Sequence, residues 1–200
     1  GALVTISLAL ATLPFGLGLG LLIALAQRSR RKFPRAFATV YTTVFRGVPE
    51  LLTLYIIYFG LTLGAQRFAR SLGFSGQFEM PPFLAGMIAL GLVLAAFSSE
   101  VWVGALNAIQ KGQREAAAAL GLTRAQAFRL IVFPQLIRVA LPGLGNNWMV
   151  MLKETSLVSV ITLQDIMFIA TRANVVTKEP FLMFGFACLL YLVFSLVSAF

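Results

Sequence analysis

The chain has 200 residues, of which 59% are hydrophobic and only 12% are charged. Soluble domains carry about 25% charged residues, so this composition argues against a soluble protein and indicates an integral membrane protein. The formal net charge is +9, but the cations gather in two loops, which favours an orientation signal over a nucleic-acid partner. The chain has no histidine and one cysteine. These counts exclude histidine-based metal sites, Ser-His-Asp triads and an internal disulfide.

Apolar segments long enough to cross a bilayer follow one another along the chain. A helix needs roughly 20 apolar residues to cross about 30 Å of hydrocarbon. The first segment, residues 3–26, has neither a basic start nor a following cleavage site, so it is not a signal peptide. Residues 36–63, 81–109 and 180–200 are the second, third and fifth segments. We predict one all-α transmembrane domain over residues 1–200, with about five spanning helices, and we expect it to be trimmed at both ends.

The fourth segment, residues 133–170, is too long for one simple span. Proline, glycine and asparagine interrupt it, and a polar cluster follows. We predict a broken helix, or a short helix followed by a span. The interrupting residues are Pro142, Gly143, Gly145, Asn146, Asn147, Lys153, Glu154, Thr155 and Ser156.

The charges of the loops predict the orientation. The connection after the first segment is basic and has no acid, and the loop at residues 110–131 carries four cations against Glu115. Because lysine and arginine accumulate in cytoplasmic loops, we expect the N-terminus outside and the C-terminus in the cytoplasm of a multi-pass membrane protein. The cations are Arg28, Arg30, Arg31, Lys32 and Arg35 in the first loop and Lys111, Arg114, Arg124 and Arg129 in the second.

The loop at residues 110–131 should hold two short helices with a sharp bend. Residues 111–120 are strong helix formers, including four consecutive alanines, and Gly121 is a natural C-terminal cap. Thr123 can cap a second helix, with Gln126 completing a capping box. A connector lying on the lipid surface is one interpretation, but such a helix usually buries bulky side chains. Alanines instead favour the close approach of another protein.

The series Glu115-Ala116-Ala117, Gly121, Ile131 and Pro134 resembles the EAA signature of permeases of ATP-binding-cassette (ABC) importers. Other strings are similar to one branch, the polar amino acid and opine permeases, and they follow in the expected order over most of the chain. These strings are residues 112–121, Arg46-Gly47-Val48-Pro49-Glu50-Leu51-Leu52, Tyr58-Phe59-Gly60, Pro134-Gln135, Leu141-Pro142-x-Leu144-x-Asn146-Asn147 and Lys153-Glu154-Thr155-Ser156-Leu157. Val103 departs from the pattern where relatives often carry arginine, and Glu154 where many carry aspartate.

The resemblance implies the membrane subunit of a type I importer in the bacterial inner membrane. Its partners would be an identical or homologous second permease, a pair of ABC ATPases and an extracytoplasmic solute-binding protein. ATP and magnesium would lie on the ATPase, and we expect no cofactor or metal on this chain. No Gly-x-x-x-x-Gly-Lys-Ser/Thr loop is present, so we expect no ATPase activity.

The resemblance also makes residues 111–120 a coupling helix that docks in the ATPase and drives alternating access. Glu115 would offer a charge to the ATPase, and Ala116 and Ala117 would permit close contact. Gly121 would make the bend, and Pro134 would start the next span.

Ionisable residues at membrane depth are candidates for substrate contact. Glu154 could pair with an amino group or a cationic side chain, while Thr155 and Ser156 could donate to a carboxylate; alternatively, Lys153 neutralises Glu154 and the hydroxyls cap a helix. Glu100, with Ser99 beside it, is a second candidate, although packing through Ser98 and Ser99 is an equal alternative.

Arg46 and Glu50 flank Gly47 and Pro49 at a spacing that predicts a structural ion pair at a helix kink. Asp165 could line the outer path or cap a helix. For the whole chain, a non-transporting scaffold or enzyme subunit is the alternative, and a channel is a weaker one. An intramembrane acid such as Glu154 suits a cationic or zwitterionic ligand. The string from Arg46 to Leu52 resembles permeases for basic amino acids and opines, which favours such a substrate without choosing among them.

Overall fold

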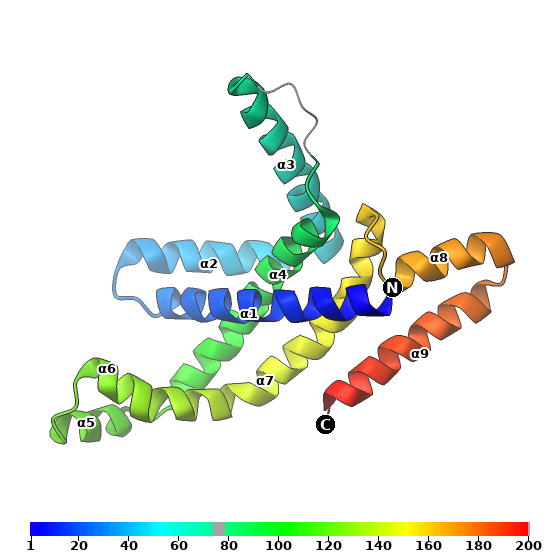
Figure 1. The fold of residues 1–200 in the computed structure, drawn as a ribbon. Helices are drawn as coiled ribbons and strands as arrows, with labels where there is room; N and C mark the ends of the chain where they lie inside the picture. Colours follow the sequence, from blue (N-terminus) through cyan, green and yellow to red (C-terminus); the bar gives the residue numbers. More distant parts are fainter. Residues whose placement is uncertain (74–78, 200) are drawn as a thin grey trace.

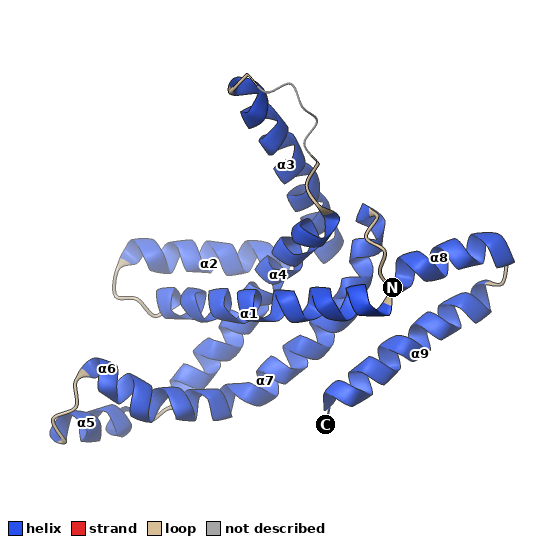
Figure 2. Cartoon of the chain, in the orientation of Figure 1, coloured by secondary structure: helices blue, strands red, loops and turns tan. Residues whose placement is uncertain are grey.

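The computed structural model describes residues 1–73 and 79–199, and this part of the chain is helical and contains no strand (Figures 1 and 2). The all-α prediction is thereby confirmed, as are five stretches long and apolar enough to cross a membrane. The elements are α1 (Ala2–Gln27), α2 (Lys32–Gly47), α3 (Glu50–Ser71), α4 (Pro82–Ala108), α5 (Lys111–Ala119), α6 (Arg124–Ala127), the π-helix η1 (Phe128–Val132), α7 (Phe133–Glu154), the 3-10 helix η2 (Thr155–Ile161), α8 (Ile166–Thr177) and α9 (Pro180–Ala199).

Helix α4 is the centre of the bundle and packs against α1, α2, α3 and α7. Small residues let α1 and α4 approach closely: a Cβ atom at Gly20 would collide with the hydroxyl of Ser98. Ser98 Oγ donates to the carbonyl of Gly16 at 3.3 Å, and Trp102 Nε1 donates to that of Leu17 at 3.2 Å. Small side chains and interhelical hydrogen bonds are how helices associate where lipid replaces water. Packing is therefore the role the structure gives Ser98.

The range predicted as the second span holds two helices. Helix α2 lies alongside α1, and α3 leaves at a steep angle and extends away from both (Figure 1). The break falls at Val48 and Pro49, whose backbones are extended. A proline has no N–H for the helical ladder and disfavours helical geometry in the residue before it. Of these two helices, α3 meets the length and hydropathy of a span.

The fourth segment breaks later than its prolines and glycines suggest. Helix α7 runs through Pro142 to Glu154, and the chain then tightens into η2, which ends at Thr162 in a left-handed conformation. Gly143 does not interrupt α7 but allows it to approach α4, because a Cβ atom there would lie 2.7 Å from Cγ1 of Val101 in α4. The small residues thus serve close packing of α7 on α4, and the polar cluster marks the end of the helix.

Candidate functional site

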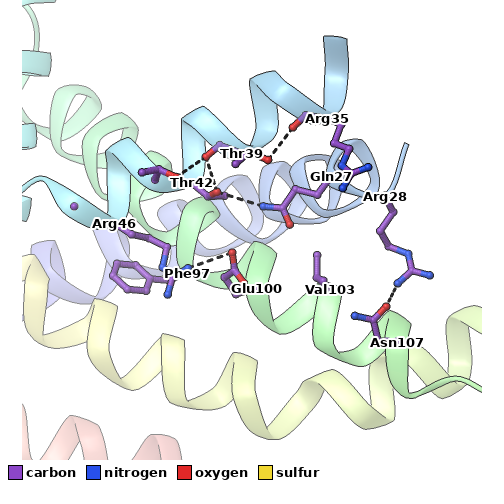
Figure 3. A pocket seen from close by; sticks show the side chains of 12 residues that line it. Gln27, Arg28, Arg35, Thr39, Thr42, Arg46, Phe97, Glu100, Val103 and Asn107 are labelled. Atoms are coloured by element: carbon purple, nitrogen blue, oxygen red, sulfur yellow. Dashed lines mark hydrogen bonds and ion pairs between the residues drawn. The ribbon is translucent and has the colours of Figure 1, made fainter. Parts of the chain in front are cut away.

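A polar cavity of about 760 Å³ lies between the end of α1, α2 and α4 (Figure 3). Its wall is rich in hydroxyl, amide and charged side chains, which is unusual within a chain of this hydropathy. The lining consists of Gln27, Arg28, Arg35, Thr39, Thr42, Thr43, Arg46, Gly47, Phe97, Glu100, Val103 and Asn107. Such a mixture of convergent polar groups with one aromatic wall is typical of a small-molecule site.

An ion pair crosses this cavity. Arg46 Nη1 in α2 lies 3.2 Å from Glu100 Oε1 in α4, and each side chain is 44% exposed. The guanidinium also stacks over the ring of Phe97, 5.7 Å from its centroid. The ion pair predicted between Arg46 and Glu50 is therefore wrong: the break at Val48 and Pro49 removes the helical spacing on which that prediction rested, and Arg46 pairs across the bundle instead.

The rest of the wall is ordered by hydrogen bonds. Gln27 Nε2 donates to Thr42 Oγ1 at 3.3 Å, and Thr42 Oγ1 donates to the carbonyl of Ala38 at 3.1 Å. Val103 faces the same cavity, so the position where an arginine was expected from the resemblance carries no charge there. The cavity thus holds one acid, Glu100, and three arginines, of which Arg46 is paired with Glu100 while Arg28 and Arg35 also line the wall.

A smaller cavity of about 190 Å³ lies on the other side of Phe97, between α4 and α7. Asn146, Asn147 and Glu154 supply its polar groups, and Phe97 lines both cavities. The Glu154 carboxylate lies within electrostatic range of Lys153 and of Glu50 in α3. Two candidate acids from two helices thus lie on either side of one aromatic side chain.

The other residues proposed for substrate contact lie elsewhere. Thr155 is fully buried and its Oγ1 donates to the carbonyl of Leu152 at 2.6 Å. Ser99 is also buried, and its Oγ donates to the carbonyl of Ala96 at 2.7 Å. Ser156 is half-buried and lines neither cavity. In this conformation the hydroxyl of Ser99 is satisfied within α4 and that of Thr155 by the last turn of α7, because serine and threonine readily bond to the backbone one turn back.

Helix α5 and its bend have the predicted local geometry. Gly121 has φ of +75°, and the N–H of Leu122 donates to the carbonyl of Ala117 at 3.0 Å. The capping box is confirmed, since Thr123 and Gln126 bond reciprocally at the start of α6. Glu115 and Ala116 are exposed, whereas Ala117 is fully covered by the chain itself. Ala117 therefore packs the loop together and is not available to a partner.

Pro134 lies in the first turn of α7, directly after the π-helical residues of η1. The helix is thus continuous from α6 into α7, where Pro134 was expected to start the next span. A proline inside a continuous helix removes one backbone hydrogen bond, and the wider turn of η1 accommodates it. This continuity connects the α5 bend mechanically to the helix that carries Glu154.

Asp165 acts as a helix cap. It is fully buried, and its Oδ1 accepts from the N–H of Phe168 at 2.8 Å at the start of α8. Burial raises the pKa of Asp165, and bonds from backbone N–H groups oppose this effect. Of the two roles considered, capping is the one the structure supports.

Sequence reasoning missed Phe97, Gln27, Thr39 and Thr42 as neighbours of Glu100. No local pattern could have identified this set, because its members come from three helices that meet only in the folded chain. The one available signal in the sequence was that α2 carries Thr39 and Thr42 on one side, which suggests a polar face but not its neighbours.

Residues 16–200 match the family of "binding-protein-dependent transport system inner membrane components". The chain is similar to the histidine/lysine/arginine/ornithine transport system permease protein HisQ of Escherichia coli, with 41% identity over 99% of this chain and 86% of the relative. It is similar to the nopaline transport system permease protein NocQ of Agrobacterium fabrum, with 39% identity over 99% and 84%.

The fold is similar to that in the crystal structure of an amino acid ABC transporter with histidines. The TM-score is 0.79 at 34% identity, and the similarity covers 98% of this chain and 86% of that one. The chain thus matches transport permeases over nearly its full length. The matched part includes the helical bundle, the polar cavity around Glu100 and the α5 bend. The protein belongs to the family of binding-protein-dependent transport system inner membrane components.

Proposed function

We propose that this permease subunit carries basic amino acids or opines, and that Glu100 recognises the cationic group of the cargo. The observation that supports this most directly is the polar cavity of about 760 Å³ with Glu100 as its acid. The names of the relatives, which include histidine, lysine, arginine, ornithine and nopaline, agree with a cargo that carries a cationic nitrogen.

Arg46 occupies the place that a cargo cation would take. Because the pair is 44% exposed on both sides, it contributes only about 0–1 kcal/mol, so a guanidinium or ammonium group could displace Arg46 at little cost. Phe97 then offers an aromatic face to the same cation. Glu154, beyond Phe97, is the next acid on the path.

Motion would reach the cavity through α5. This helix joins the end of α4 directly and the start of α7 through α6 and η1, so a push on α5 moves the helices that carry Glu100 and Glu154. Exposed Glu115 and Ala116 would contact the ATPase, and Gly121 would hold the bend. ATP and magnesium would be bound by that ATPase.

The remaining partners would cover the apolar surfaces. The spans α3 and α9 bury only 11% and 6% of their most apolar windows within the chain, which leaves room for a second permease, identical or homologous, and for lipid. A solute-binding protein would deliver cargo outside. In this arrangement the N-terminus is outside the cell and the C-terminus is cytoplasmic, in the inner membrane.

The test is uptake of labelled arginine and glutamate by vesicles that contain the complete importer. Glu100→Gln keeps the size of the side chain and removes its charge. We expect arginine uptake to fall roughly tenfold or more, because a hydrogen bond to a charged group contributes about 1.5–3 kcal/mol. Glu79→Gln, an exposed acid outside both cavities, is the matched control. Full arginine uptake by Glu100→Gln, or a wild-type preference for glutamate, would overturn the proposal.

A further inference from the structure

A second cavity of about 760 Å³ lies at the basic end of the bundle, lined by residues of the loop after α1 and of the α5–α6 turn. Neither Arg46 nor Glu100 lines it, although Arg28 lines both cavities. Three arginines and several large apolar side chains line it: Arg28, Arg30, Arg124, Leu25, Leu106 and Phe128.

The charge of this cavity is uncompensated. No acidic side chain lines it, and within residues 1–73 and 79–199 the ion pair is that of Arg46 and Glu100. The guanidinium of Arg28 is held in place from α4, since Nη1 donates to Oδ1 of Asn107 (Figure 3). Guanidinium groups bind phosphate oxygens with two parallel hydrogen bonds, so the cavity is suited to a phosphate group.

The apolar lining indicates where this phosphate would come from. Leu25 and Leu106 belong to the last turns of the spanning helices α1 and α4, and Phe128 belongs to η1. Leu25 is 42% exposed, so the cavity has an apolar side at membrane depth and a cationic side beyond it. A phospholipid has the same division between acyl chain and headgroup. An acidic segment of the ATPase would match the arginines but not this apolar side.

We propose that this cavity binds an anionic phospholipid, with the headgroup phosphate between Arg28, Arg30 and Arg124 and an acyl chain against Leu25 and Phe128. The proposal rests on the proposed function for its setting, the cytoplasmic leaflet, whose anionic lipids attract basic segments next to spanning helices. The lipid would join the two basic loops and so connect the α1–α2 loop to the coupling helix.

The test is a titration of the complete importer, ATPase included, in neutral detergent. The probes are fluorescent phosphatidylglycerol and phosphatidylcholine with the same acyl chains, and inorganic phosphate is the competitor. The double variant Arg30→Gln/Arg124→Gln removes one cation from each loop. Arg31→Gln/Arg129→Gln removes the same charge from exposed positions of the same loops outside the cavity and is the control.

Wild type and control should bind phosphatidylglycerol roughly tenfold or more tightly than phosphatidylcholine, and the cavity variant should lose this preference. Equal affinity of cavity variant and wild type would overturn the proposal. So would displacement of the lipid by millimolar phosphate, which indicates a site for the free anion, or loss of ATPase subunits from the cavity variant with lipid binding intact. Because no cargo is present, the result is independent of the uptake test.

Discussion

Individual charges decide the chemistry of this protein, because the chain has few of them and the cavity around Glu100 contains one acid. Val103 lies one turn after Glu100 on the same helix and adds no charge to the wall. A further guanidinium at this position would compete with any cargo for Glu100, since opposite charges attract strongly where water is partly excluded.

We therefore expect Val103→Arg to weaken the uptake of basic cargo roughly tenfold, as an increase in KM. Val103→Leu adds bulk without charge and should change KM by less. The measurement is initial uptake rate against arginine concentration in vesicles. An unchanged KM in Val103→Arg would show that position 103 does not face bound cargo.

Gly121 is a residue whose backbone limits what can replace it. Its φ of +75° costs a residue with a Cβ atom about 1 kcal/mol or more. Gly121→Val should distort the bend and lower the ATPase rate stimulated by cargo-loaded binding protein, while the protein still inserts in the membrane. Gly112→Ala is the control, because that glycine lies in α5 with open space around it and no positive φ. Equal stimulation in Gly121→Val and wild type would contradict a coupling role for the bend.

Asp165 gives a prediction about pH. It lies outside the candidate spans, burial raises its pKa, and its Oδ2 has no hydrogen-bond partner among the described residues. When the pKa of an acid is higher in the folded state than in the unfolded state, folding favours its protonated form. Its contribution to stability is therefore complete below the unfolded pKa of about 3.9 and is lost as the pH rises through the folded-state pKa. Asp165→Asn keeps the cap without the charge, so its Tm relative to wild type should rise as the pH is raised above the unfolded pKa of about 3.9.

Asp165→Ala supplies the control for that experiment. It removes the cap as well as the charge, so it should be less stable than Asp165→Asn by about 1 kcal/mol at every pH. Thermal unfolding of the detergent-solubilised importer measures both variants. A Tm difference for Asp165→Asn that falls with pH would show that the buried carboxylate is stabilising when ionised.

At the scale of elements, the contact between α4 and α7 is close at one glycine and open at another. A Cβ atom at Gly143 would lie 2.7 Å from Cγ1 of Val101, whereas Gly145 has open space. The same helix thus carries one glycine required by packing and one that is not, although both look alike in the sequence.

Gly143→Ala should accordingly lower the free energy of unfolding by about 1–3 kcal/mol through overpacking, and Gly145→Ala should be neutral or slightly stabilising, because alanine is the better helix former. Combining Gly143→Ala with Val101→Ala should restore part of the loss. Thermal unfolding in detergent measures all three. Equal effects of the two glycine substitutions would contradict the described register of α7 on α4.

At the scale of the whole molecule, the helices have two functional ends. One end gathers the basic loops, α5 and α6, and the other carries the capped start of α8 near the N-terminus (Figure 1). In the proposed function, this polarity would let a cytoplasmic ATPase act on a path that opens outside.

The orientation can be measured with a membrane-impermeant maleimide. Single cysteines at exposed positions, Glu79→Cys and Glu115→Cys, are placed in a Cys188→Ser background, which removes the chain's own exposed thiol. In right-side-out vesicles we expect labelling at position 79 and none at position 115 until the membrane is permeabilised. Labelling of position 115 in intact vesicles would reverse the proposed topology.

The local features of this protein could be predicted from its sequence. Long apolar runs, the alanine helix with Gly121 behind it and the capping box of Thr123 and Gln126 depend on neighbours within a few residues, so composition and spacing determine them. The family signature around Glu115 belongs to the same class of information.

Only the tertiary structure decided which side chains meet. Arg46 pairs with Glu100, 54 positions away, and Glu50 lies within electrostatic range of Glu154. Ala117 is buried while Ala116 is exposed, and the hydroxyls of Thr155 and Ser99 donate to carbonyl groups of the preceding helical turn. The physical reason is that a helix determines its own spacing, but packing against other helices determines which of its faces is covered and which cavity each charge enters.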